Sequence, residues 1–186
     1  DWVLERVVAG LPVTSADIAA MGVGGLLKEI PSRPEPRAGG ARAPRRPFVS
    51  AVLLAAGSSS RMGGRDKLME QVEGVPQIAR AARALRDSRA DEVVAVLGPG
   101  QDARRAALSG LGVRIVENPE AAEGMASSIR AALAALAPEA DAVAIAPADM
   151  PELSPAHLDR LIAAFDPEEG RAIVRAAAEG GAPGHP

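Results

Sequence analysis

The feature that most restricts the fold of this chain is a short apolar run that ends at a glycine. Residues 52–56 read Val-Leu-Leu-Ala-Ala, and Gly57 follows them directly. A run of this length, without alternating polar residues and bounded by glycine, is typical of a strand buried on both faces. Such strands lie in parallel sheets that carry helices on both sides. We therefore expect a buried strand within an α/β domain.

The segment that follows Gly57 has a composition suited to binding a polyanion. Residues 58–67 contain three serines, two glycines and three cations. Backbone N–H groups in glycine-rich turns, together with positive side chains, form binding sites for phosphate groups. The spacing matches neither common phosphate motif, because no Gly-Lys-Ser/Thr stands at the Walker A distance and no G-x-G-x-x-G follows the strand. We interpret the segment as a nucleoside triphosphate loop of another type.

Strand-like and helix-like segments alternate along the rest of the chain. The expected strands are 92–97, 113–116, 141–146 and 172–176, and the expected helices begin near Pro76, Gln101, Met125 and Ser154. This alternation predicts right-handed βαβ units in a Rossmann-like, three-layer α/β/α fold with a mainly parallel sheet. Ligands of such folds bind beyond the carboxyl ends of the strands.

The part of the chain before this domain divides into two segments. Residues 1–30 predict two short helices, which are too little to fold alone. Residues 31–47 contain five prolines, two glycines, five arginines and one glutamate. This composition is typical of an extended linker whose arginines stay solvated. We expect residues 48–186 to form the α/β domain.

Composition argues against several classes of protein. The chain has no cysteine and only two histidines, so we expect neither a disulfide framework nor a zinc site of thiolates or histidines. No apolar run approaches the roughly 18 residues of a membrane span, and the start does not resemble a signal peptide. Outside the basic linker the chain is acidic, which disfavours nucleic acid as a partner. We expect a cytoplasmic protein with neither a membrane nor a nucleic-acid partner.

The sequence Leu-Ala-Ala-Gly-x-Ser-x-Arg-Met-Gly, followed by a lysine, resembles a family of nucleotidyltransferases. That family contains molybdenum cofactor cytidylyltransferase and guanylyltransferase, and sugar-nucleotide and methylerythritol cytidylyltransferases are more distant members. The resemblance implies that Arg61 and Lys67 neutralise the β- and γ-phosphates as pyrophosphate leaves. Either cation alone could be a solvated surface residue, and we expect Arg65 and Asp66 to be solvent-exposed loop residues. The residues it implies for nucleotide binding are Leu54, Ala55, Ala56, Gly57, Ser58, Ser60 and Gly63.

A second segment, near residue 120, resembles the family's N-P-x-x-x-x-G-M-x-x-S motif. Gly124 would allow close backbone approach, and the serines offer hydroxyls and free N–H groups at a helix start. Simple capping of that helix is the alternative that these residues leave open. The residues that the resemblance implies for nucleotide binding here are Asn118, Gly124, Met125, Ser127 and Ser128.

A third segment, Ala148-Asp149-Met150-Pro151, resembles the metal-binding A-D-M-P motif of the same family. The resemblance implies that Asp149 is a ligand of Mg²⁺, for which a carboxylate oxygen is well suited. The alternative is a turn residue before Pro151. This segment follows the strand expected at 141–146, so Asp149 and the Gly57 loop should lie at the same edge of the sheet.

Two further likenesses concern the ends of the chain. Residues 21–37 resemble the tail of a molybdopterin-binding domain that precedes this transferase in some fusion proteins, although a helical leader is an equal alternative. Gly184-His185-Pro186 resembles the start of the segment that leads to the family's second metal-binding aspartate. On this reading the second carboxylate and part of the acceptor site are absent, and we expect the fragment to bind nucleotide but to catalyse poorly or not at all. A simple chain terminus at Pro186 is the alternative.

The function implied by the resemblance is transfer of a nucleoside monophosphate to a phosphorylated acceptor. Leu54-Ala55-Ala56-Gly57 is more similar to the cytidylyl than to the guanylyl branch, so we expect CTP and molybdopterin as substrates, with Mg²⁺ as cofactor. An acceptor molybdoenzyme or a chaperone is a further partner that the resemblance allows. The alternatives are a sugar-phosphate nucleotidyltransferase and a non-catalytic nucleotide-binding or interaction module.

Overall fold

The computed structural model describes residues 46–57, 66–167 and 169–176. Residues 46–162 form one unit, which holds the sheet, and the described residues from Ala163 onward belong to a second unit. The predicted helical segment at 1–30 and nearly all of the predicted linker lie outside the described residues, as does Gly184-His185-Pro186.

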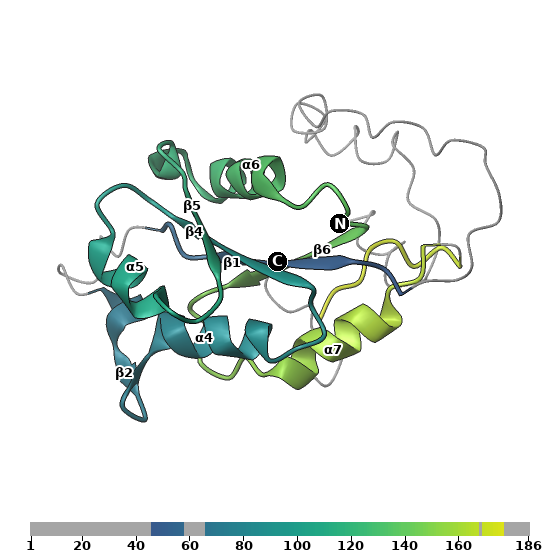
Figure 1. Ribbon diagram of the computed structural model, residues 1–186, viewed down its shortest axis with the longest axis horizontal. Coiled ribbons are helices and arrows are strands. Elements are labelled where there is room, and N and C mark those ends of the chain that lie inside the picture. Colours follow the sequence, from purple (N-terminus) through teal and green to yellow (C-terminus); the bar gives the residue numbers. More distant parts are fainter. Residues whose placement is uncertain (1–45, 58–65, 168, 177–186) are drawn as a thin grey trace. The chain divides into compact units, whose positions relative to one another are not determined.

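A four-stranded parallel sheet forms the centre of the first unit (Figure 1). Its strands lie in the order β5-β4-β1-β6. This arrangement confirms the predicted α/β fold with a mainly parallel sheet. The strands are β1 (Val49–Leu54), β4 (Glu92–Leu97), β5 (Arg114–Glu117) and β6 (Ala142–Pro147).

Helices follow these strands along the chain and lie on both sides of the sheet (Figure 1). They are α4 (Gln77–Arg86), α5 (Asp102–Leu108), α6 (Met125–Ala135) and α7 (Pro155–Ala164), with 3-10 turns η2 (Lys67–Met69) and η3 (Ala121–Glu123). The sequence patterns did not foresee the antiparallel hairpin of β2 (Gln71–Val72) and β3 (Val75–Pro76). Among the described residues, no helix is long and apolar enough to cross a bilayer.

The direction of the connections reverses at β1. From β1 the chain passes through α4 to β4 and through α5 to β5, and it then returns through α6 to β6 on the other side of β1. In an open parallel sheet, ligands bind beyond the carboxyl ends of the strands at such a switch point. The fold therefore points to the ends of β1 and β6 as the ligand-binding edge.

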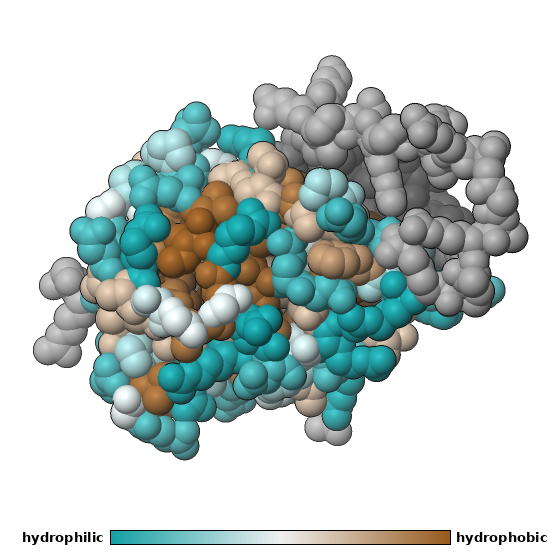
Figure 2. Space-filling view, in the orientation of Figure 1, coloured by the Kyte–Doolittle hydropathy of each residue, from teal (hydrophilic) through white to brown (hydrophobic). Residues whose placement is uncertain are grey.

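Strand β1 is buried on both faces, as its sequence predicts. Ala51 and Leu53 belong to the core cluster that includes Ile78 of α4 and Leu158 of α7, and Val52 belongs to a second cluster with Ala132 of α6. In the orientation of Figure 1, apolar side chains gather over the strands, between hydrophilic surfaces on either side (Figure 2). Burial of a leucine, isoleucine or valine side chain in these clusters stabilises the folded state by roughly 1.5–3 kcal/mol.

A polar cluster fixes the opposite, amino-terminal edge of the sheet. The Glu92 carboxylate accepts hydrogen bonds from Ser50 Oγ at 2.6 Å, from the Ala137 N–H at 2.9 Å and from Arg114 Nη2 at 2.8 Å. Burial works to raise the pKa of Glu92, but these three donors outweigh it and hold the pKa below its ordinary value. Glu92 is therefore a charged structural residue, remote from the ligand edge.

The strand predicted at residues 172–176 is wrong. None of these residues forms a strand, and the described chain before them makes only a bridge between Asp166 and Arg171. Ile173 is 56% exposed, so the run does not bury the apolar surface that a central parallel strand would bury. A five-residue segment that is largely apolar but contains Arg175 does not specify a hydrogen-bonding partner, which explains the error.

Candidate functional site

Two segments meet at the carboxyl ends of the adjacent strands β1 and β6. The Ala148 N–H donates to the Leu54 carbonyl at 3.0 Å, and the Ala55 N–H donates to the Val96 carbonyl at 3.0 Å. These bonds continue the ladders one step beyond the strands. The backbone of residues 55–57 and the segment that carries Asp149 therefore lie at the same edge of the sheet. The sequence predicted this placement.

Lys67 and Asp149 form an ion pair at this edge. Lys67 is the first residue of η2, and its Nζ lies 3.7 Å from Asp149 Oδ2. The two side chains are 48% and 56% exposed, respectively. Because both side chains are this exposed, a ligand from solvent can reach them. An ion pair with this exposure also contributes little to the stability of the fold. The structure thus brings together two of the residues that the sequence singled out.

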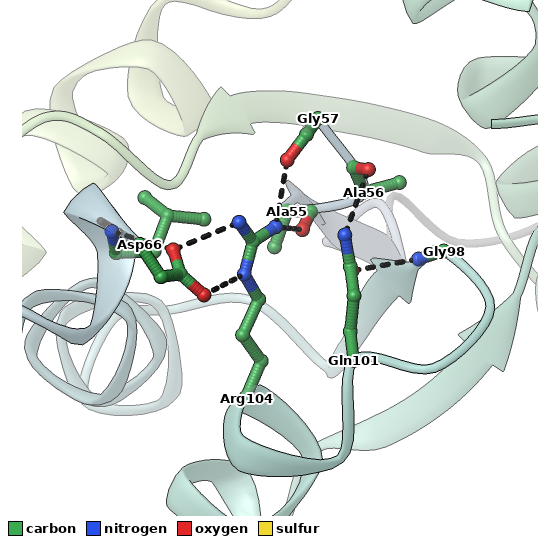
Figure 3. Close-up of polar contacts among 8 residues, drawn as sticks. Ala55, Ala56, Gly57, Asp66, Gly98, Gln101 and Arg104 are labelled. Carbon is green, nitrogen blue, oxygen red and sulfur yellow. Dashed lines mark hydrogen bonds and ion pairs between the residues drawn. The ribbon is translucent and has the colours of Figure 1, made fainter. Parts of the chain in front are cut away.

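A buried arginine, Arg104, joins the two segments that flank residues 58–65 (Figure 3). Arg104 is 3% exposed. Its Nη1 donates to the Ala55 carbonyl and, at 2.9 Å, to the Gly57 carbonyl. Its Nε and Nη2 donate to Asp66 Oδ2 and Oδ1 at 2.7 and 2.8 Å. The guanidinium therefore makes a bidentate pair with one segment while it holds two carbonyls of the other.

The expectation of an exposed, solvated Asp66 is wrong. Besides accepting from Arg104, Asp66 Oδ1 accepts from the Leu68 N–H at 3.1 Å and so caps η2. A carboxylate at this position is favourable because it satisfies an otherwise unpaired N–H at the start of the turn. Arg65, which was expected to behave in the same way, lies outside the described residues.

Gln101 completes the contacts to the turn after β1. Its Nε2 donates to the Ala56 carbonyl at 3.0 Å, and its Oε1 accepts from the Gly98 N–H at 2.8 Å (Figure 3). The carbonyls of Ala55, Ala56 and Gly57 are thus all bonded to side chains from α5 or the residue before it. Within the described part of the chain, the N–H groups of Ala56 and Gly57 have no hydrogen-bond acceptor.

Gly98 is required by the close approach of this turn. A Cβ on Gly98 would lie 3.3 Å from the Ala56 carbonyl oxygen and 3.2 Å from Ala121 Cβ. Both distances are tighter than ordinary van der Waals contact, so a larger residue would push the turn away from β4. The glycine therefore helps to define where the backbone of residues 55–57 lies.

The second sequence motif forms a buried network at the end of β5. Asn118 is 2% exposed, and its Nδ2 donates to Ser127 Oγ at 2.8 Å and to Ser128 Oγ at 3.1 Å. Its Oδ1 accepts from the Glu120 N–H at 3.0 Å. Ser127 Oγ also lies 2.8 Å from the carbonyls of Glu120 and Gly124. Asn118 thus bonds to both serine hydroxyls, and Asn118 and Ser127 also bond to the connection that leads into α6.

Gly124 and Met125 are the surface members of the same motif. Gly124 has φ +107°, which favours glycine, and Met125 is 53% exposed. The buried network thus supports an exposed helix start, at which backbone N–H groups are available to a ligand.

The other predicted site residues fall into two groups. Leu54, Ala55 and Ala56 are buried or half-buried, so their contribution to a ligand would come from the backbone. Ser58, Ser60, Arg61 and Gly63 lie outside the described residues.

Asp149 is an exposed carboxylate at this edge that a metal ion could reach. No group of three or more histidine, cysteine, aspartate or glutamate side chains among them is arranged to hold a metal. Asp149 alone fits a Mg²⁺ ion that arrives with a nucleotide, because Mg²⁺ is commonly held by one or two carboxylates together with substrate phosphates and water.

Comparison with protein families gives a match over most of the chain. The family described as MobA-like NTP transferase domain matches residues 51–186. Relatives include the 2-C-methyl-D-erythritol 4-phosphate cytidylyltransferase of Ralstonia nicotianae, 34% identical over 66% of this chain and 52% of the relative. The molybdenum cofactor guanylyltransferase of Burkholderia vietnamiensis is 34% identical over 64% of this chain and 58% of its own. The nicotine blue oxidoreductase of Paenarthrobacter nicotinovorans is 35% identical over 65% and 59%.

Solved structures with the same fold include nucleotidyltransferases. A nucleotidyl transferase from Methanothermobacter thermautotroptrophicus has a TM-score of 0.56 and 32% identity, covering 64% of this chain and 58% of that one. The protein Rv0371c of Mycobacterium tuberculosis, in complex with manganese, has a TM-score of 0.53 and 27% identity over 62% and 58%. The chain spans little more than half the length of the relatives named above.

Proposed function

The chain belongs to the MobA-like NTP transferase family, and on this premise we propose that it transfers a nucleoside monophosphate from a nucleoside triphosphate to a phosphorylated acceptor. The observation that carries the proposal is the exposed ion pair of Lys67 and Asp149 beyond the ends of β1 and β6. A cation and a carboxylate at this edge are the groups that a metal-bound triphosphate requires.

The turn at residues 55–57 would bind the nucleotide through its backbone. The N–H groups of Ala56 and Gly57 are unpaired within the described part of the chain, whereas the carbonyls are engaged. Free N–H groups in a turn favour an acceptor-rich or anionic ligand. Met125, the first residue of α6, would contribute a further backbone contact to the base or the ribose, and Gly124 would allow close approach of the ligand.

The reaction exchanges one phosphoanhydride bond for another. An oxygen of the acceptor's phosphate forms a bond to the α-phosphorus, and the bond from the α-phosphorus to the bridging oxygen of pyrophosphate breaks. The attacking phosphate is already ionised, so no general base is needed. Lys67, together with Arg61, would neutralise the charge that develops on the β- and γ-phosphates. A Mg²⁺ ion bound to Asp149 would act as a Lewis acid that polarises the phosphoryl oxygens.

The finer assignment is CTP as donor and molybdopterin as acceptor. It rests on the likeness of Leu54-Ala55-Ala56-Gly57 to the cytidylyl branch, since a purine with its larger edge would need the room of a second glycine. The relatives' names cover cytidylyl transfer, guanylyl transfer and, in one case, oxidoreduction. Direct measurement of nucleotide preference is therefore the decisive experiment.

Thermal unfolding with each Mg-nucleotide tests the proposal. A ligand that binds only the folded state at a hundred times its Kd stabilises that state by about 2.7 kcal/mol. We expect Mg-CTP to raise Tm more than Mg-GTP. A larger shift with Mg-GTP would reassign the donor. Unchanged Tm with every triphosphate would contradict the proposed activity and favour a non-catalytic interaction module.

A further inference from the structure

We propose that Arg104 is a positioning residue that sets the place of Lys67 beside Asp149, and through Lys67 the affinity for the β- and γ-phosphates of a nucleotide. The inference rests on the proposed function, but its first step concerns the protein alone. The starting observation is that Arg104 is buried on α5, a helix that none of the sequence motifs includes.

The first step runs from α5 to Asp66. Arg104 uses Nε and Nη2 for the two oxygens of Asp66, while Nη1 bonds the carbonyls of Ala55 and Gly57 (Figure 3). The planar fork fixes both the distance and the orientation of the carboxylate, which a lysine ammonium could not do. Asp66 is thereby held against the turn that follows β1.

The second step runs from Asp66 to Lys67. Asp66 Oδ1 accepts from the Leu68 N–H at 3.1 Å, and the Asp66 carbonyl accepts from the Met69 N–H at 2.9 Å. Side chain and main chain of Asp66 therefore both anchor η2, whose first residue is Lys67. The Lys67 ammonium then reaches to 3.7 Å from Asp149 Oδ2.

The energetics favour a positioning role over a purely stabilising one. Removing a guanidinium from water is costly, and replacing buried ion pairs with well-packed apolar residues is often neutral or stabilising. Arg104, at 3% exposure, incurs that cost, and all four of its described bonds go to the turn and to Asp66. What the arginine adds is a defined geometry at the ligand edge.

The neighbouring Arg105 provides a matched control. It lies on the same helix, and its Nη2 pairs with Glu117 Oε2 at 2.8 Å, with both side chains about half exposed. Arg105→Met removes the same charge and shape from α5 without touching Asp66 or the turn. Asp66→Asn is a second, milder variant, because it keeps the size and the capping oxygen but removes the charge that Arg104 binds.

The first measurement follows Lys67 without any nucleotide. The chain contains two lysines, Lys28 and Lys67, so reductive ¹³C-methylation gives few NMR signals and each lysine keeps its charge. We expect Asp149→Asn to shift the Lys67 signal in the wild-type and Arg105→Met backgrounds, and to leave it unmoved in Arg104→Met and Asp66→Asn. An equal shift in all four backgrounds would overturn the proposal.

The second measurement compares Mg-CTP with Mg-CMP, which lacks the β- and γ-phosphates. Loss of a charge-assisted contact to a phosphate predicts that Arg104→Met and Asp66→Asn weaken Mg-CTP binding about tenfold or more. Mg-CMP binding should change far less, and Arg105→Met should affect neither nucleotide. Equal losses for both nucleotides would mean that Arg104 merely supports the turn, and the proposal would be wrong. If the wild-type chain binds neither nucleotide, the proposed function fails, while the NMR result still decides whether Arg104 positions Lys67.

Discussion

Lys67 Nζ lies 3.7 Å from Asp149 Oδ2, so a side chain from η2 meets one from the segment after β6. The two residues are 82 positions apart in the sequence (149 − 67), and the parallel pairing of β1 with β6 brings them to one edge. Because both groups are exposed, the pair is better suited to exchange its partners for a ligand than to hold the fold together.

Replacing Lys67 with methionine should weaken nucleotide binding without unfolding the protein. A charge-assisted hydrogen bond contributes about 1.5–3 kcal/mol, so we expect Mg-CTP affinity to fall roughly 10- to 150-fold. Tm should change little, because an exposed ion pair contributes only about 0–1 kcal/mol. Isothermal titration calorimetry measures the affinity, and Lys28→Met is the control for loss of a lysine. Unchanged affinity in Lys67→Met would contradict a phosphate-binding role.

Asp149→Asn should remove the dependence of nucleotide binding on Mg²⁺. In the wild type we expect CTP to bind more tightly with Mg²⁺ than with EDTA, since the carboxylate would share the ion with the phosphates. The asparagine variant should bind CTP about equally in the two conditions. Glu152→Gln, which neutralises a nearby exposed carboxylate, should keep the wild-type difference. A persistent Mg²⁺ effect in Asp149→Asn would exclude Asp149 as the ligand.

Gly98→Ala should destabilise the fold at the ligand edge. The added Cβ would lie 3.2 Å from Ala121 Cβ and 3.3 Å from the Ala56 oxygen, and overpacking of this kind costs about 1–3 kcal/mol. Urea unfolding gives the free energy directly. Gly57→Ala is the comparison, since a Cβ there meets no atom of the described residues within 4 Å and should leave stability nearly unchanged.

Glu92→Gln should make stability less dependent on acid. The pKa of Glu92 is lowered in the folded protein from 4.5, so its ionised form stabilises the fold above the unfolded pKa. That contribution is lost as the pH falls through the lowered folded value. We expect the variant to be less stable than wild type at pH 7 by roughly 1–3 kcal/mol. This difference in the free energy of unfolding should shrink as the pH is lowered below 4.5. Chemical denaturation across pH 3–7 measures the free energy of unfolding of both proteins. A difference that does not change with pH would contradict a charged Glu92.

The sequence was sufficient to predict the central strand and the ligand edge. The apolar run before Gly57 has the length and composition of a strand buried on both faces, and β1 is buried on both sides. The rule that ligands bind at the carboxyl ends of parallel strands then predicts that the loop after Gly57 and Asp149 lie at the same edge. These features follow from local pattern and from topology, which a sequence carries.

Arg104 could not be identified in the same way, because α5 contains two adjacent arginines and charge alone does not distinguish them. A usable signal was nevertheless present. Arg104 stands four residues before Leu108, so the two share one face of the helix, and both are buried. Arg105 is offset from that face and is exposed. The role of Asp66 depends on Arg104, so it was missed for the same reason.

The three carbonyls of residues 55–57 also bear on which ligands this edge would reject. Potassium ions and polyamines seek carbonyl oxygens, and those of Ala55, Ala56 and Gly57 are already occupied by Arg104 and Gln101. The abundant cations of a cell would thus find little to coordinate at this turn. If the turn binds a triphosphate as proposed, its preference for anions would come from these engaged carbonyls as much as from its N–H groups.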